Sequence, residues 1–65
     1  MNNRIAELRG VHKVTQEELA LAVSTTRQTI NSLERGRYNA SLALAQKISR
    51  FFGLTIEEVF LFEED

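Results

Sequence analysis

The stretches TQEELA (residues 15–20) and TTRQTINSLERG (residues 25–36) decide the fold of this chain. Thr15 and Glu18 have the spacing of a capping box, in which each side chain accepts a hydrogen bond from the other residue's backbone N–H. A helix is therefore expected to begin directly after Thr15. The second stretch continues the helical pattern after a short break, so the two stretches predict two short helices joined by a tight turn.

The second of these helices is expected from Arg27 to Arg35, with Thr26 as its N-cap. Gly36 stands where a left-handed residue ends a helix, and residues 24–25 form the turn before it. The helix begins with polar groups and keeps its apolar side chains on the other face. The inner faces of the two helices are expected to be Leu19, Ala20, Val23, Ile30 and Leu33.

The flanking segments are also helical in pattern. One helix is predicted from near Asn3 to His12, passing through Gly10 at a cost of about 1 kcal/mol relative to alanine. Ile5 and Leu8 lie on its inner side, together with Val11 or His12.

Two further helices follow in the second half of the chain. Ser41 caps a helix from Leu42 to Phe52, whose inner face is Leu44, Ala45, Ile48 and Phe52. Thr55 and Glu58 form a second capping box for a short helix reaching about Phe60. Leu61-Phe62 has strand character, and is expected to pair with the N-terminal residues or with a partner chain.

Composition limits what such a domain can do. The 65 residues form one domain, without cysteine and with His12 as the only histidine, so neither a disulfide framework nor a metal site is expected. No combination of side chains supports catalysis or a small-molecule site, and no cofactor is expected. Without a signal peptide or a membrane-spanning run, the chain is predicted to be cytoplasmic.

The net charge of −1 hides an uneven distribution of charge. Residues 1–50 carry all eight basic side chains against four acidic ones, whereas residues 51–65 carry five acidic side chains and no basic one. This asymmetry is consistent with a basic face for a polyanion and an acidic end held away from it. A simple domain with an acidic tail is the alternative.

Three stretches resemble the helix-turn-helix regulators of the Cro/phage-repressor (xenobiotic response element) family. They are TQEELA, STTRQTINSLERGRYNAS (residues 24–41) and LALAQKISRFFGLTIEEVF (residues 42–60), and they cover nearly the whole chain. Within the family, the chain resembles small stand-alone members such as the cytolysin repressor, which end soon after the fifth helix. The resemblance implies an all-α, five-helix, lambda-repressor-like fold and no enzymatic activity. It also implies a repressor that binds a palindromic operator in double-stranded DNA as a homodimer.

The chain departs from the family pattern at three positions. Ser24 replaces a turn glycine, Ala40 replaces a proline before Ser41, and Leu21 occupies a position that is usually charged. A left-handed backbone at Ser24 would cost on the order of 1 kcal/mol. None of the three lies on the expected DNA face.

Base contacts are expected from the start of the helix Arg27–Arg35. The Gln28 amide can donate and accept at once, which matches the N6 and N7 edge of adenine. Arg27 can bind guanine O6 and N7 or a phosphate, and no acidic residue in the first turn offsets its charge. By family correspondence Ser32, one turn after Gln28, is a third base contact.

Phosphate or flanking contacts are expected on both sides of these residues. Arg35 and Arg37 should position the domain rather than specify a sequence, while Tyr38 is expected to pack with its hydroxyl at the rim. The full flanking set is Gln16, Thr26, Thr29, Asn31, Arg35, Arg37 and Asn39. In contrast, Arg9 and Glu34 correspond to a partly buried salt bridge in lambdoid repressors and are expected to be structural.

The C-terminal segment, residues 54–65, is rich in apolar side chains. A contiguous exposed apolar patch usually marks an interface, so a dimer is predicted through Leu54, Ile56, Phe60, Leu61 and Phe62. The alternative is that all of them are core. A different function, that of an antitoxin-type module holding a partner protein through this patch and Leu21, also stays open.

Overall fold

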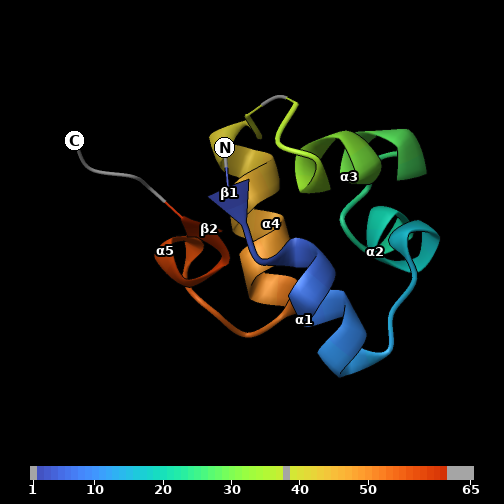
Figure 1. The fold of residues 1–65 in the computed structure, drawn as a ribbon, viewed down its shortest axis with the longest axis horizontal. Helices are drawn as coiled ribbons and strands as arrows, with labels where there is room; N and C mark the ends of the chain where they lie inside the picture. The colour runs from blue at the N-terminus through green and yellow to red at the C-terminus, as the bar shows by residue number, and fades with distance from the viewer. Residues whose placement is uncertain (1, 38, 62–65) are drawn as a thin grey trace.

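The computed structural model describes residues 2–37 and 39–61, and within them five helices and two short strands follow one another (Figure 1). Their bounds are β1 (Asn2–Asn3), α1 (Ile5–His12), α2 (Gln16–Ala22), α3 (Arg27–Glu34), α4 (Leu42–Phe51), α5 (Ile56–Val59) and β2 (Phe60–Leu61). The predicted all-α class with five helices and a short terminal strand pair is thereby confirmed. Tyr38 and Phe62 lie outside the described residues.

Side-chain caps start the helices where the sequence predicts them. The Glu18 N–H donates to the Thr15 hydroxyl at 3.0 Å, and the Thr15 N–H donates to the Glu18 carboxylate at 2.9 Å. Thr55 and Glu58 repeat this capping box at α5. Thr26 caps α3 by accepting from the Thr29 N–H at 3.1 Å. These bonds satisfy N–H groups that a helix leaves unpaired in its first turn.

The turn between α2 and α3 places Ser24 in the left-handed region, with φ 58. Glycine adopts this backbone without steric cost, whereas serine loses about 1 kcal/mol. The steric cost expected from serine in place of the turn glycine at position 24 is therefore present. Lys13, which ends α1 with φ 57, carries the same kind of strain, and the sequence did not indicate it.

Several predicted bounds were wrong by one or two residues. The first helix begins at Ile5 rather than Asn3, because Asn2 and Asn3 pair with β2. The Asn3 side chain instead accepts from the Ile5 N–H at 3.2 Å. The helices expected to end at Arg35, Phe52 and Phe60 end at Glu34, Phe51 and Val59, so each of those residues stands directly after its helix.

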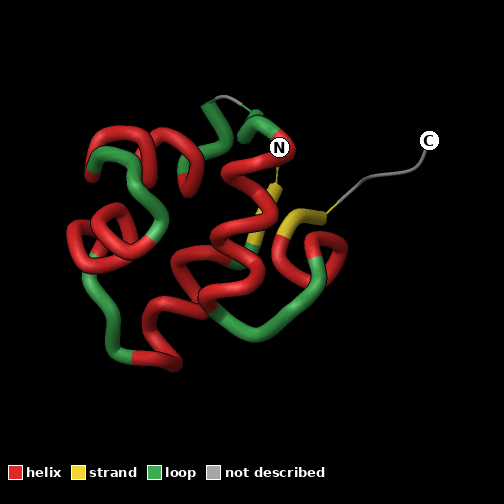
Figure 2. The backbone as a smooth tube through the Cα atoms, turned by 180° about the vertical axis from the view of Figure 1, so that it is seen from behind, coloured by secondary structure: helices red, strands yellow, loops and turns green. Residues whose placement is uncertain are grey.

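The two strands join the ends of the described chain. β1 and β2 are antiparallel, with Asn2 opposite Leu61 and Asn3 opposite Phe60 (Figure 2). The Arg4 N–H extends the connection by donating to the Val59 carbonyl at 2.8 Å. Of the two pairings expected for the terminal strand, the structure has the one with the N-terminal residues.

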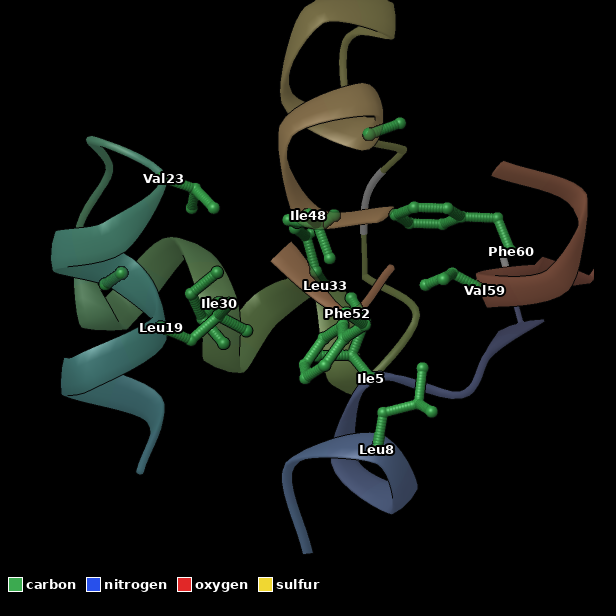
Figure 3. Packing of buried hydrophobic residues seen from close by; sticks show 12 residues of the cluster. Ile5, Leu8, Leu19, Val23, Ile30, Leu33, Ile48, Phe52, Val59 and Phe60 are labelled. Carbon is green, nitrogen blue, oxygen red and sulfur yellow. The ribbon is translucent and has the colours of Figure 1, made fainter. Parts of the chain in front are cut away.

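One apolar core runs from α2 and α3 to α5, with α4 and α1 between them (Figure 3). Most of the predicted inner residues are buried, and Leu44 is partly buried; the buried ones are Ile5, Leu8, Leu19, Ala20, Val23, Ile30, Leu33, Ala45, Ile48 and Phe52. Val11 is 71% exposed and thus excluded from the core, while the His12 ring packs 5.2 Å from the Phe52 ring. The core members that the sequence did not place are Val59 and Phe60.

Phe60 corrects one expectation about the C-terminus. Its side chain is 1% exposed within a single copy of the chain, because β2 turns it toward α4 and the core (Figure 3). Burying a large apolar side chain in this way stabilises the fold by about 1.5–3 kcal/mol. Phe60 therefore has almost no surface left to offer to a second copy.

The two capping boxes make stability depend on pH. The Thr15 backbone N–H and, second, the Thr15 hydroxyl lower the pKa of Glu18; the Thr55 groups lower the pKa of Glu58 in the same way. A carboxylate with a lowered pKa stabilises the fold in its charged form, so this contribution is complete above the ordinary pKa of 4.5. It is lost as the pH falls below that value.

We therefore expect Glu18→Gln combined with Glu58→Gln to reduce the fall in Tm between about pH 5 and about pH 3. Circular dichroism melts at both pH values measure this fall. The matched control is Glu17→Gln with Glu57→Gln, which removes neighbouring carboxylates from the same first turns. An equal fall in Tm for both double variants would contradict the capping explanation.

Candidate nucleic-acid interface

Helix α3 exposes a polar face at the edge of the molecule. Arg27 and Gln28 are exposed in its first turn, and Asn31 and Ser32 are half-buried one turn later. Ile30 and Leu33 point into the core from the opposite side. Figure 1 shows α2 and α3 together at one side of the fold, with α5 and β2 at the other side. The polar face of α3 is therefore open to a binding partner.

Helices α2 and α3 together form a polar hollow of about 380 Å³, lined by Gln16, Arg27, Gln28, Asn31 and Arg35. The hollow brings residues expected to contact bases beside residues expected to contact phosphates. Three residues of the expected DNA-contacting set do not line this hollow. Ser32 lies on α3, whereas Arg37 and Asn39 follow α3 and are exposed.

Three cations at this edge have no ion-pair partner among residues 2–37 and 39–61. Arg27, Arg35 and Arg37 are exposed, and no carboxylate among the described residues forms an ion pair with them. The arginines that do form ion pairs are Arg4, with Glu7, and Arg9, with Glu34. Since the first turn of α3 contains no acidic residue, this edge favours an anionic partner.

A partly buried ion pair holds α3 against α1. Arg9 Nε donates to Glu34 Oε2 at 2.6 Å, and Arg9 Nη2 donates to Glu34 Oε1 at 3.0 Å. The two side chains are 20% and 9% exposed. The hydrogen bond to Glu34 raises the pKa of Arg9, against the opposing effect of burial. Arg9 Nη1 also donates to the Val14 carbonyl at 3.1 Å, so the same arginine also binds the segment that precedes α2.

Gln16 joins this ion pair. Its Nε2 donates to Glu34 Oε1 at 3.0 Å and to Asn31 Oδ1 at 3.3 Å. Arg35 Nε approaches the same Asn31 oxygen at 3.4 Å. Gln16 was expected to bind a phosphate. The sequence did not indicate these contacts, because its partners Asn31 and Glu34 are 15 and 18 residues away along the chain.

Two threonines of the expected flanking set are engaged in the cap. The Thr26 hydroxyl accepts from the Thr29 N–H and donates to the Thr29 hydroxyl at 2.9 Å. Their hydroxyls therefore stabilise the start of α3. Another contact that the sequence did not indicate closes its end, where Asn3 Nδ2 donates to the Leu33 carbonyl at 2.7 Å.

Within residues 2–37 and 39–61, no group of three or more His, Cys, Asp or Glu side chains is placed to hold a metal ion. In the same ranges, no helix has the length and hydropathy needed to cross a bilayer.

Two helices joined by a tight turn, with a polar face on the second, define a helix-turn-helix DNA-binding domain. The helix-turn-helix family profile matches residues 5–59, and the chain therefore belongs to this family, of the Cro/C1 type.

Two relatives match this chain over its full length. An uncharacterised HTH-type transcriptional regulator from Methanocaldococcus jannaschii is 46% identical, and the match covers 100% of this chain and 98% of the relative. One from Archaeoglobus fulgidus is 51% identical over 100% of this chain and 92% of its own length.

The solved structure of the clp gene regulator ClgR from Corynebacterium glutamicum has the same fold. Its TM-score is 0.77 at 28% identity, over 83% of this chain and 57% of that chain. The chain is thus a DNA-binding transcriptional regulator of a non-enzymatic family, as the sequence predicted. The antitoxin-type alternative is not favoured by these relatives.

The Arg9–Glu34 pair should be costly to break from one side. Arg9→Ala leaves a Glu34 carboxylate that is 9% exposed without its cation, so we expect a loss of about 2–3 kcal/mol in the free energy of unfolding. Urea denaturation measures it. As a control, Glu7→Ala breaks the exposed Arg4–Glu7 pair and should cost no more than about 1 kcal/mol. Equal losses in the two variants would show that the partly buried pair contributes no more to the free energy of unfolding than the exposed pair.

Proposed function

We propose that this regulator represses transcription by binding a palindromic operator as a homodimer, with α3 in the major groove. The observation that carries the proposal is the exposed polar face of α3. Its arginines form no ion pair within the described part of the chain, and the Arg9–Glu34 ion pair braces its inner side. Occupancy of a promoter by such a dimer would exclude the transcription machinery.

In this proposal Arg27, Gln28 and Ser32 contact base edges. Thr29, Asn31, Arg35, Arg37 and Asn39 lie on either side of them and contact phosphates or flanking bases. Gln16 could donate to a phosphate only by releasing Glu34 or Asn31. The Thr26 hydroxyl could do so only by giving up its hydrogen bond to the Thr29 hydroxyl.

Gln28→Ala should separate sequence recognition from general affinity. The exposed Gln28 side chain supports no other part of the described fold, so its removal should weaken binding to the preferred sequence by about 1–3 kcal/mol. Affinity for random DNA should stay nearly unchanged. Fluorescence anisotropy with a selected operator and a random duplex measures both, and equal losses on the two duplexes would exclude Gln28 as a base contact.

Arg37→Ala is the matched comparison. Loss of one phosphate contact should weaken all sequences alike and reduce the slope of log affinity against log salt by about 1. A change in sequence preference without a change in slope would contradict the phosphate role.

The proposed dimer surface is narrower than the apolar C-terminal segment. Leu61 is 44% exposed, and Leu54 and Ile56 are partly buried against the core, so these three residues remain as candidates. Phe60 is part of the core, and Phe62 is outside the described residues. A two-fold dimer through this end would place two α3 helices about 34 Å apart, one turn of DNA.

Leu61→Glu should therefore shift the protein from dimer to monomer, because a charged side chain at a closed apolar interface is poorly solvated. Analytical ultracentrifugation measures the mass. Leu42→Glu is the control, since Leu42 is an exposed apolar residue, 75% exposed, at the start of α4. A dimer that survives Leu61→Glu, or a wild-type monomer, would contradict this interface.

A further inference from the structure

We propose that Asn31 is a specificity-determining residue that presents only hydrogen-bond donors to DNA, and that Gln16 is the positioning residue that orients it. The inference rests on the proposed placement of α3 in the major groove. It follows from a series of hydrogen bonds that begins at the Arg9–Glu34 pair. Each residue in the series determines whether the next residue faces it with a donor atom or an acceptor atom.

The first steps decide the orientation of the Gln16 amide. A guanidinium only donates and a carboxylate only accepts, so Glu34 is the acceptor throughout its contacts with Arg9. The Gln16 atom that lies 3.0 Å from Glu34 Oε1 must then be the donor Nε2. The ion pair thus determines which way the Gln16 amide faces.

The next steps decide the orientation of Asn31. Gln16 Nε2 lies 3.3 Å from the Asn31 amide, and Arg35 Nε approaches the same atom at 3.4 Å. Two donors that converge on one atom require an acceptor, which is Oδ1. No hydrogen bond within the described residues uses Asn31 Nδ2. The donor side of the amide is left for a ligand.

A donor-only asparagine has a definite preference on DNA. Bidentate pairing with adenine requires Oδ1 to accept from N6 while Nδ2 donates to N7, and here Oδ1 is already occupied. Nδ2 instead matches a hydrogen-bond acceptor, which is purine N7 in the major groove or a phosphate oxygen. Arg27 and Arg35 line the same hollow, and their charges favour such electron-rich groups.

Gln16 then acts through Asn31. Both hydrogens of its amide are directed at Glu34 and Asn31, and its remaining atom is an acceptor, which does not suit a phosphate. The expected phosphate contact is therefore replaced by a role in orientation. A side chain on α2 would in this way influence which group α3 recognises.

The test begins with selection of bound duplexes by the wild-type protein from a random pool. The selected site is then synthesised with single 7-deazapurines, which lack N7, and in a second series with single methylphosphonates, which lack the phosphate charge. Affinities of wild type and Asn31→Ala are measured by anisotropy at one salt concentration. A single lost hydrogen bond should cost the wild type about fivefold at one modified position.

Asn31→Ala should bind the unmodified site about fivefold more weakly and should lose its sensitivity at that one position. A 7-deazapurine at that position identifies a base as the acceptor, which the specificity role requires. A methylphosphonate alone identifies a phosphate and overturns the specificity role, because a phosphate contact carries no sequence information. If Asn31→Ala keeps the wild-type sensitivity at every position of both series, the proposal is overturned.

The orienting role of Gln16 has its own readout. Gln16→Ala frees the Asn31 amide to rotate, so sensitivity at the same position should fall, while Gln16→Ala added to Asn31→Ala should change it no further. Retained sensitivity in Gln16→Ala overturns the positioning role. Gln46→Ala, an exposed amide on α4, should behave as the wild type, and melts by circular dichroism verify that each variant is folded.

The two levels of the proposal can fail separately. A wild-type protein that enriches no sequence from the pool overturns the proposed function, and the role of Asn31 with it. A wild-type protein that enriches a site whose recognition does not depend on Asn31 overturns only the role of Asn31.

Discussion

The Glu34 carboxylate is the point at which three segments of this domain meet. It accepts from Arg9 of α1 and from Gln16 of α2, while it belongs to α3 itself. At 9% exposure such a charge is stable only with its partners in place. The exposed face of α3 depends on this arrangement, because the ion pair holds the inner side of the helix and begins the hydrogen-bond chain that reaches Asn31.

The opposite end of the domain is closed by a different kind of interaction. β1 pairs with β2, the Arg4 N–H binds the Val59 carbonyl, and Phe60 fills the core. Asn3 connects the two ends, since its side chain donates to the last turn of α3 at the Leu33 carbonyl. The domain therefore has a closed end, formed by the strands and α5, and an open edge, formed by α2 and α3 (Figure 1).

Local interactions explain why most elements were predictable. The capping boxes at Thr15 and Thr55 and the apolar spacing of α3 and α4 act within one or two turns, so they can be recognised in sequence alone. The start of α1 and the end of α5 were predicted wrongly because Asn3 and Phe60 pair with each other as parts of β1 and β2. These two strands are more than 50 residues apart in the chain. Phe60 was placed in an interface for the same reason: its apolar character is visible in sequence, but the surface it packs against is not.

The sequence by itself determined the helix-turn-helix, its caps, most of the core and the polar edge of α3, because periodicity and spacing encode each of them. It also indicated the Arg9–Glu34 pair through family resemblance. Only the tertiary structure decided that Gln16 faces Glu34 and Asn31. It alone also decided that Phe60 is buried and that β2 pairs with β1. These outcomes depend on distances between segments remote in the chain, where hydrogen-bond direction and burial are defined only after the helices have packed.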